Sequence, residues 1–184
     1  LVRKIQDAMP AAPAARAAVD MALYDLMGKH LKMPLAELLG RVHRSLPTSI
    51  TIGIESIKES LEEAQEYLGR GFQILKVKLG NSIEEDLERL HRLRENVGQQ
   101  IAIRVDINQG YSVEEYTQFI NKTQSLDLEF IEQPLKAPDI DSMRKLPAGI
   151  REKTAADESL IDATDALKYT YPSRPFGIYN IKLM

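Results

Sequence analysis

Two lysines, Lys76 and Lys78, stand one residue apart in the stretch "FQILKVKLG". Leu75, Val77 and Leu79 alternate with them, which is the period of a β-strand with one buried face. Side chains two positions apart in a strand point to the same side, so the two ammonium groups should lie one pleat apart. Because a cation beside another cation favours the neutral form of one of them, the pair predicts a lysine that acts as a base.

Charged residues recur where the apolar, strand-like segments of the chain end. The series consists of Lys78, Asp106, Glu132, Asp157 and Lys182. Successive members are 28, 26, 25 and 25 residues apart. Three of them are carboxylates, the chain has no cysteine, and no histidine stands near them, so a metal would be bound by oxygen. Oxygen ligands are typical of Mg²⁺, whereas zinc sites use nitrogen or sulfur. The sequence therefore predicts a magnesium site.

From residue 48 onward, strand-like and helix-like segments alternate with a repeat of about 25 residues. The strand-like segments are "TSITIGI", "FQILKVKLG", "QIAIRVDINQG", "LEFIEQPL", "KTAADES" and "FGIYNIKLM". This alternation predicts an α/β fold with a parallel sheet: a flavodoxin-like sheet, a Rossmann sheet or a (β/α)8 TIM barrel. No G-x-G-x-x-G or Walker sequence follows a strand, and the even repeat favours the barrel. Since the carboxyl ends of barrel strands meet at one face, the charged series would converge there.

We expect two parts in the chain. Residues 1–44 have the pattern of helices and precede the first strand. Residues 45–184 contain six βα units, so a barrel of eight strands would be incomplete. The chain is therefore expected to be an internal piece of a larger protein, with a complete six-stranded domain as the alternative. Within the first part, Tyr24, Leu26 and Met27 at helical spacing predict core packing rather than a binding site.

The composition argues against several classes of partner. The formal net charge is −3, and basic and acidic residues are mixed along the chain, which argues against nucleic acid. The sequence contains no run of about 18 apolar residues, which a membrane span would require. The start of the chain does not resemble a signal peptide, so a cytoplasmic location is the expectation. The mixed charges of "EEDLERLHRLRE" predict a solvated helix face with ion pairs four residues apart.

The motifs at the strand ends resemble those of the enolase superfamily, specifically its muconate-lactonizing subgroup. The segments that carry the resemblance are "KVK", "VDINQGYS", "EQP", "ADES" and "IKLM", in this order. The segment "ARAAVDMALYDLMGKHLKMPLAELLG" before them resembles the helical end of the α+β capping domain of that family. Within the subgroup, the sequence looks most like the dipeptide epimerases, such as those acting on L-Ala-D/L-Glu.

The resemblance implies that Asp106, Glu132 and Asp157 are the Mg²⁺ ligands. On chemistry alone, either Asp157 or Glu158 of "ADES" could be the third ligand, and the resemblance favours Asp157. It also implies an oligomer of identical subunits.

The acid–base roles follow from the same resemblance. Lys78 and Lys182 would be two acid–base catalysts on opposite sides of the barrel mouth, and Lys76 would assist Lys78 and stabilise negative charge on the enolate. Asn108 would orient a ligand or a water near the metal. The reaction implied is abstraction of the proton α to a carboxylate and its return through an enolate, as in an epimerase or racemase acting on a small carboxylate substrate, in particular a dipeptide.

Alternatives remain open at this point. A lyase or cycloisomerase of the same superfamily, such as o-succinylbenzoate synthase or muconate cycloisomerase, would use similar residues, as would an N-acylamino-acid racemase. A different class of protein, an inactive barrel fragment or scaffold, would keep the motifs without catalysis. Mg²⁺-dependent proton exchange distinguishes these classes.

Overall fold

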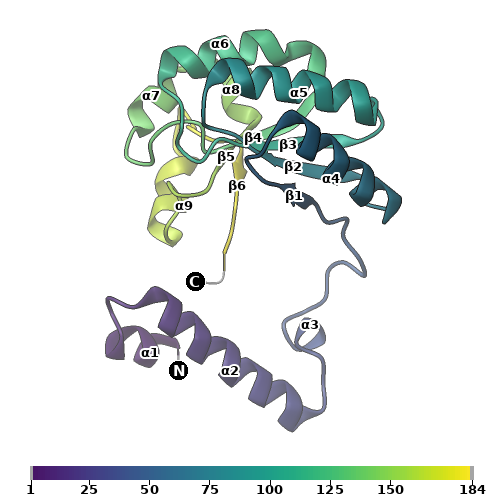
Figure 1. Ribbon diagram of the computed structural model, residues 1–184. Helices are drawn as coiled ribbons and strands as arrows, with labels where there is room; N and C mark the ends of the chain where they lie inside the picture. Colours follow the sequence, from purple (N-terminus) through teal and green to yellow (C-terminus); the bar gives the residue numbers. More distant parts are fainter. Residues whose placement is uncertain (1, 183–184) are drawn as a thin grey trace. The chain divides into compact units, whose positions relative to one another are not determined.

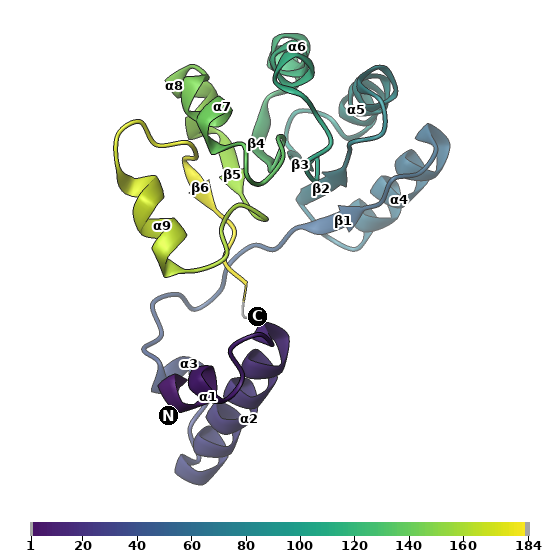
Figure 2. The same cartoon turned by 90° about the vertical axis from the view of Figure 1, so that its left-hand side faces the viewer.

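The computed structural model describes residues 2–182. Contacts divide the described chain into two units, one of residues 2–46 together with Lys182, the other of Pro47–Ile181. The larger unit contains the sheet and is shown from two sides in Figure 1 and Figure 2. Within residues 2–182, no helix has both the length and the apolar character needed to cross a membrane.

The described part of the larger unit contains one parallel sheet of six strands. They are β1 (Ile50–Ile52), β2 (Ile74–Lys78), β3 (Ala102–Asp106), β4 (Leu128–Glu132), β5 (Thr154–Ala156) and β6 (Ile178–Tyr179). Their spatial order is the order of the chain, and every neighbouring pair is parallel. A flavodoxin-like or Rossmann sheet reverses its strand order part-way, whereas a TIM barrel does not. The barrel-type prediction is therefore confirmed.

Helices follow the strands and lie on one side of the sheet. In the larger unit they are α4 (Ile57–Gly69), α5 (Ile83–Val97), α6 (Val113–Thr123), the 3-10 turn η1 (Gln124–Leu126), α7 (Ile140–Lys145), α8 (Ala148–Glu152) and α9 (Ala163–Thr170). Figure 2 shows the strands in a curved row with these helices on its outer side. This is the layering expected of βα units that bury one face of each strand.

Local signals at the helix starts were readable in the sequence. Ser56 is the N-cap of α4, and its hydroxyl accepts a hydrogen bond from the backbone N–H of Glu59 at 3.3 Å. The Glu59 carboxylate accepts in return from the backbone N–H of Ser56 at 3.0 Å. Ser112 and Glu115 repeat this reciprocal capping box at the start of α6. Each box satisfies N–H groups that have no partner within the helix, which fixes where the helix begins.

The side-chain alternation of β3 sets the register of the sheet. Ile103, Val105 and Ile107 are fully buried and belong to the core between sheet and helices. Arg104 and Asp106 point to the other face, where Arg104 bonds Glu129 at 2.7 Å. A slip of one residue would turn these charges into the core and lose about 1.5–3 kcal/mol for each large apolar side chain exposed.

Strand β5 contains a buried polar residue, Thr154, whose hydroxyl is satisfied by its packing. All three of its residues are buried. The Thr154 hydroxyl pairs with the Tyr116 hydroxyl at 2.7 Å and donates to the carbonyl of Ile150 at 2.8 Å, so its polar atom is satisfied inside the core. The sixth strand, predicted through "FGIYNIKLM", covers Ile178–Tyr179; Leu183 and Met184 lie outside the described residues.

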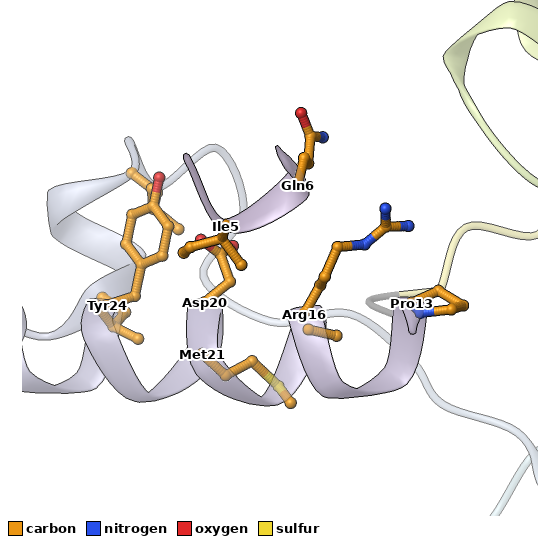
Figure 3. A pocket seen from close by; sticks show the side chains of 10 residues that line it. Ile5, Gln6, Pro13, Arg16, Asp20, Met21 and Tyr24 are labelled. Carbon is orange, nitrogen blue, oxygen red and sulfur yellow. The ribbon is translucent and has the colours of Figure 1, made fainter. Parts of the chain in front are cut away.

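The N-terminal unit consists of α1 (Val2–Ala8), α2 (Pro13–Leu31) and α3 (Leu35–Leu38). Between them is a hollow of about 620 Å³, which Tyr24 lines together with residues of all three helices (Figure 3). Leu26, two positions further on, is 63% exposed, and Met27 is exposed as well. The prediction of core packing is therefore wrong for these two residues, because neither is buried within the N-terminal unit.

Candidate active site at the carboxyl ends of the strands

Strand pairing brings the predicted residues of β2, β3 and β4 into one row. Lys78 is directly opposite Asp106, and Asp106 is directly opposite Glu132. Glu132 faces Ala155 on β5, so Asp157 follows two residues beyond that pair. All four stand where their strands end, which is the edge at which α/β barrels place their active sites.

The two lysines bind the carboxylates of this row. The Nζ atom of Lys76 lies 3.0 Å from Oδ2 of Asp106 and 2.8 Å from Oε2 of Glu132. The Nζ atom of Lys78 lies 2.7 Å from the same Asp106 oxygen and donates to Oδ1 of Asn108 at 2.7 Å. Both carboxylates are buried, whereas the lysines are only partly buried. Charged hydrogen bonds of this length are strong, so they hold the row together.

The two carboxylates have opposite pKa shifts. Burial by itself would raise the pKa of Asp106, but hydrogen bonds from Lys78 and Lys76 outweigh it and hold the pKa below its ordinary value. Burial raises the pKa of Glu132, aided by the charge of Asp106, and the bond from Lys76 does not offset this. The difference follows from the number of lysines, since Asp106 binds two and Glu132 binds one.

Lys76 responds to the same contacts. Burial acts to lower its pKa, but its hydrogen bonds to Glu132 and Asp106 outweigh burial and raise the pKa above the ordinary value. Lys76 is therefore held as a cation between two carboxylates. The contacts of Lys76 with Asp106 and Glu132 were not predicted. The predicted role of Lys76 in assisting Lys78 as a base stays a prediction.

Two asparagines complete the polar edge. The backbone N–H of Asn108 donates to Oδ1 of Asp106 at 3.1 Å, and its side chain donates to Oε1 of Glu158 at 3.3 Å. Asn108 has a positive φ of 47°, a conformation that asparagine tolerates better than most residues. Asn180, just beyond β6, donates to Oε1 of Glu132 at 2.9 Å. Asn108 was predicted as a site residue, whereas Asn180 was not among the predicted site residues.

Gln133 links the ends of β4 and β5. Its side-chain oxygen accepts from the backbone N–H groups of Asp157 and Ser159, both at 3.0 Å. Its amide nitrogen donates to Oγ of Ser159 at 2.7 Å and to the carbonyl of Leu135 at 3.0 Å. Gln133 is fully buried and uses its complete bonding capacity. It therefore fixes the backbone at Asp157, a role that sequence reasoning missed although Gln133 lies in the motif "EQP".

The donor atoms of this edge suit a hard cation. Among the described residues, no group of three aspartate, glutamate, histidine or cysteine side chains is gathered closely enough to hold a metal ion. Asp106 and Glu132 nevertheless present carboxylate oxygens side by side, and Oε2 of Glu158 is buried with no hydrogen-bond partner within residues 2–182. A bound cation would satisfy such an oxygen. Asp157 and Glu158 therefore both stay candidates for the third ligand.

Five of the predicted site residues are bonded directly to one another. Lys76, Lys78, Asp106, Asn108 and Glu132 are brought together by hydrogen bonds and ion pairs. Lys182 is exposed and belongs by its contacts to the N-terminal unit, so its role as the second acid–base catalyst stays a prediction.

The prediction of a solvated charged face on α5 holds for Glu84, Glu85, Glu88, Arg92 and Glu95, which are exposed, and is wrong for three other charged residues. Asp86, Arg89 and Arg94 within "EEDLERLHRLRE" are only 2%, 4% and 5% exposed, so this face of the helix is not solvated. The three residues share the helical spacing of Leu90 and Leu93, which are core residues. That spacing is the signal that could have revealed them as buried. Hydrogen bonds to the backbone of neighbouring segments offset the cost of burying each of these charges.

Two family models match the chain. A family model described as enolase C-terminal domain-like matches residues 59–171, more than half of the chain. The chain belongs to this family. A second model, the N-terminal domain of mandelate racemase and muconate lactonizing enzyme, matches residues 1–40. The predicted superfamily is thereby confirmed.

Members of the enolase family with similar sequences are named epimerases. The chain is 55% identical over 184 residues to the L-Lys-D/L-Arg epimerase of Desulforapulum autotrophicum. The match covers all of this chain and 52% of that protein. It is 32% identical over 183 residues to the L-Ala-D/L-Glu epimerase of Clostridium acetobutylicum, covering 98% of this chain and 51% of that protein. The chain therefore spans about half the length of the curated relatives it matches.

A solved member of the family has the same fold. The crystal structure of the dipeptide epimerase from Methylococcus capsulatus, complexed with Mg and the dipeptide L-Arg-D-Lys, superposes with a TM-score of 0.95 at 49% sequence identity. The match covers 99% of this chain and 51% of that chain.

Proposed function

We propose that the protein containing this chain is a Mg²⁺-dependent epimerase of dipeptides, an isomerase of the enolase superfamily. The observation that carries the proposal is the row Lys78–Asp106–Glu132, in which a lysine stands beside two buried carboxylates at the ends of neighbouring strands. The epimerase names of relatives up to 55% identical support it. They do not favour the lyase and cycloisomerase alternatives.

Dipeptides that contain lysine or arginine are the first substrates to test. The identity to the L-Lys-D/L-Arg epimerase is 55%, against 32% for the L-Ala-D/L-Glu epimerase. The preference for L-Ala-D/L-Glu, which the motifs alone suggested, is therefore replaced in this proposal by a preference for cationic dipeptides.

Lys78 and Lys182 act as the two acid–base groups in the proposed reaction. The neutral amine of Lys78 removes the α-proton, and the electron pair left on the α-carbon moves into the adjacent carboxylate to form an enolate. The ammonium of Lys182 then returns a proton to the opposite face, which inverts the centre. The reverse reaction exchanges the two roles. Lys76 supplies a fixed positive charge, and Asn108 orients the Lys78 amine through the bond between them.

Asp106, Glu132 and Asp157 would hold Mg²⁺, with Glu158 as the alternative to Asp157. When bound, Mg²⁺ would supply a Lewis acid for the substrate carboxylate. Lys76 forms ion pairs with both Asp106 and Glu132. When the metal binds, Lys76 would therefore have to share these carboxylate oxygens with it or release them.

The domain organisation is part of the proposal. Residues 1–44 would be the C-terminal helices of an N-terminal capping domain, and residues 45–184 would hold the first six strands of a barrel. The positions of the two matched family models, 1–40 and 59–171, support this division. A cytoplasmic homo-oligomer that binds neither nucleic acid nor membrane is also part of the proposal, and light scattering on the purified protein tests the oligomeric state.

Proton NMR in D₂O tests the reaction. The full-length protein is incubated with Mg²⁺ and a pool of L,L- and L,D-dipeptides. We expect the α-proton signal of one residue to disappear while the signals of the diastereomer grow. The Lys182→Ala variant should lose epimerisation yet keep one-sided α-proton exchange, and Lys122→Ala, which removes an exposed lysine on α6, should behave as wild type. Epimerisation by Lys182→Ala would contradict the two-lysine assignment, and absence of exchange in any dipeptide would contradict the epimerase itself.

A further inference from the structure

Helix α5 carries a buried arginine, Arg89, that binds the backbone of strand β2 at Lys78. Arg89 donates through Nη1 to the carbonyl of Gly53 at 2.8 Å and through Nη2 to the carbonyl of Lys78. Gly53 follows the last residue of β1, and Lys78 is the last residue of β2. One guanidinium therefore joins two strand ends at the edge where the site lies.

Asp86 and Tyr111 hold this arginine in place. Asp86 is one turn before Arg89 on α5, and their side chains form an ion pair at 3.7 Å. Oδ2 of Asp86 also accepts from the Tyr111 hydroxyl at 2.7 Å and from the backbone N–H of Gly80 at 2.8 Å. All three side chains are buried, so the network is shielded from water and its bonds are correspondingly strong. It connects the loops that follow β1, β2 and β3.

The network binds Lys78 at its backbone and not at its ammonium group. The Nζ atom of Lys78 is bound by Asp106 and Asn108, while its carbonyl is bound by Arg89. A carbonyl fixed at the strand end limits rotation of the backbone at the residue that carries the side chain. The amine of Lys78 is therefore restrained at both ends, and displacement of either end would change where the amine lies.

We propose that Arg89, held by Asp86 and Tyr111, is the positioning residue for the base Lys78. The inference rests on the proposed function, because it takes Lys78 as one of two acid–base groups. Arginine suits this role since its planar fork offers several donors in fixed directions, whereas lysine offers a single nitrogen.

The same helix provides a matched control. Arg94 is as deeply buried as Arg89 and also binds backbone carbonyls, those of Leu126 at 2.9 Å, Gly98 at 2.7 Å and Ile101 at 2.6 Å. These carbonyls precede β3 and β4, at the opposite end of the strands. Arg89→Lys and Arg94→Lys therefore remove similar bonds from one helix, but only the first removes them beside Lys78.

The test measures exchange by each lysine separately. In the full-length protein with Mg²⁺, a Lys182→Ala background leaves only the exchange catalysed by Lys78, and a Lys78→Ala background leaves only that catalysed by Lys182. Deuterium incorporation at the α-carbon of each dipeptide epimer reports the rate. We expect Arg89→Lys to lower the rate about 10- to 100-fold in the Lys182→Ala background and less than about 3-fold in the Lys78→Ala background. Arg94→Lys should change the exchange rates in the two backgrounds by the same factor.

A purely structural role for Arg89 would lower both rates by the same factor, and that result would overturn the inference. Tyr111→Phe, which removes one hydrogen bond to Asp86 and keeps the ring, is the milder second variant if Arg89→Lys does not fold. It should show the same selectivity with a smaller factor, and equal loss of both exchanges in Tyr111→Phe would equally contradict the inference. Absence of exchange in both single-lysine backgrounds would instead reject the proposed function, so the two failures are distinguishable.

Discussion

The ammonium nitrogen of Lys76 lies 2.8 Å from a carboxylate oxygen of Glu132, although strand β3 separates their two strands. The same nitrogen lies 3.0 Å from Asp106 on the strand between them. Lys76 therefore neutralises two buried carboxylates that would otherwise repel each other. A divalent cation would provide the same neutralisation, so Lys76 and Mg²⁺ should act partly as substitutes for one another.

Replacement of Lys76 by alanine should destabilise the metal-free protein and increase its response to Mg²⁺. Removing one partner of a largely buried ion pair costs about 3 kcal/mol of the free energy of unfolding. Thermal unfolding with and without Mg²⁺ measures both effects. Lys168→Ala, which removes an exposed ion pair with Asp165 at 3.1 Å, should cost less than about 1 kcal/mol and leave the Mg²⁺ response unchanged. Equal Mg²⁺ responses in wild type and Lys76→Ala would show that the lysine and the metal do not share these oxygens.

Replacement of Gln133 by leucine should lower both stability and Mg²⁺ affinity. The backbone N–H groups of Asp157 and Ser159 would lose their acceptor inside the protein, which costs about 1–3 kcal/mol for each unsatisfied group. Urea unfolding measures the stability, and calorimetric titration measures the affinity for Mg²⁺. Gln65→Leu, at an exposed position bonded to Asn96, is the control and should change the stability by no more than about 0.5 kcal/mol. Unchanged Mg²⁺ affinity in a folded Gln133→Leu variant would separate Asp157 from the metal site.

Gly80→Ala should be destabilising, and Gly69→Ala should be slightly stabilising. Gly80 has a φ of +112°, and a Cβ atom there would lie 2.6 Å from the backbone oxygen of Ile107. Strain and overlap together should cost about 2 kcal/mol or more. Gly69 ends helix α4, and a Cβ atom added there would meet no neighbouring atom within 4 Å, so alanine gains up to about 1 kcal/mol of helix propensity. Chemical unfolding of both variants checks the signs, and a stabilised Gly80→Ala would mean that the loop after β2 is not held against β3.

The capping box of α4 should make stability depend on pH in the acid range. Hydrogen bonds from the Ser56 hydroxyl and backbone N–H lower the pKa of Glu59 below its ordinary value of 4.5. The stabilisation is therefore complete above the ordinary pKa and is lost as the pH falls through the lower folded-state pKa. Glutamine at this position keeps an acceptor without a charge.

The comparison of wild type with Glu59→Gln isolates this charge. Urea unfolding at about pH 7 should show the wild type to be the more stable of the two, and the difference should shrink as the pH is lowered from about 5 to about 3. In a Ser56→Ala background the difference should depend less on pH, since the hydroxyl that binds the carboxylate is gone. A difference that grows on acidification would contradict the lowered pKa.

Much of the fold could be predicted because its signals are local. The alternation of Ile103, Val105 and Ile107 with Arg104 and Asp106 identifies a strand and assigns its two faces. Serine followed three residues later by glutamate marks the starts of α4 and α6. The spacing of 28 and 26 residues places Lys78, Asp106 and Glu132 at the same edge, since each repeat adds one strand and one helix.

The sequence by itself thus determined the barrel-type topology, the edge at which the polar residues gather and the residue types available for chemistry. Only the tertiary structure decided which of these groups touch: Lys76 with Glu132 across an intervening strand, Gln133 with the backbone of Asp157, and Arg89 with the carbonyl of Lys78. Two of these three contacts end on backbone atoms, which are the same in every residue and leave no signal in the sequence. Their partners are set by how helices and loops pack on the sheet, and that packing depends on contacts between residues far apart in the chain.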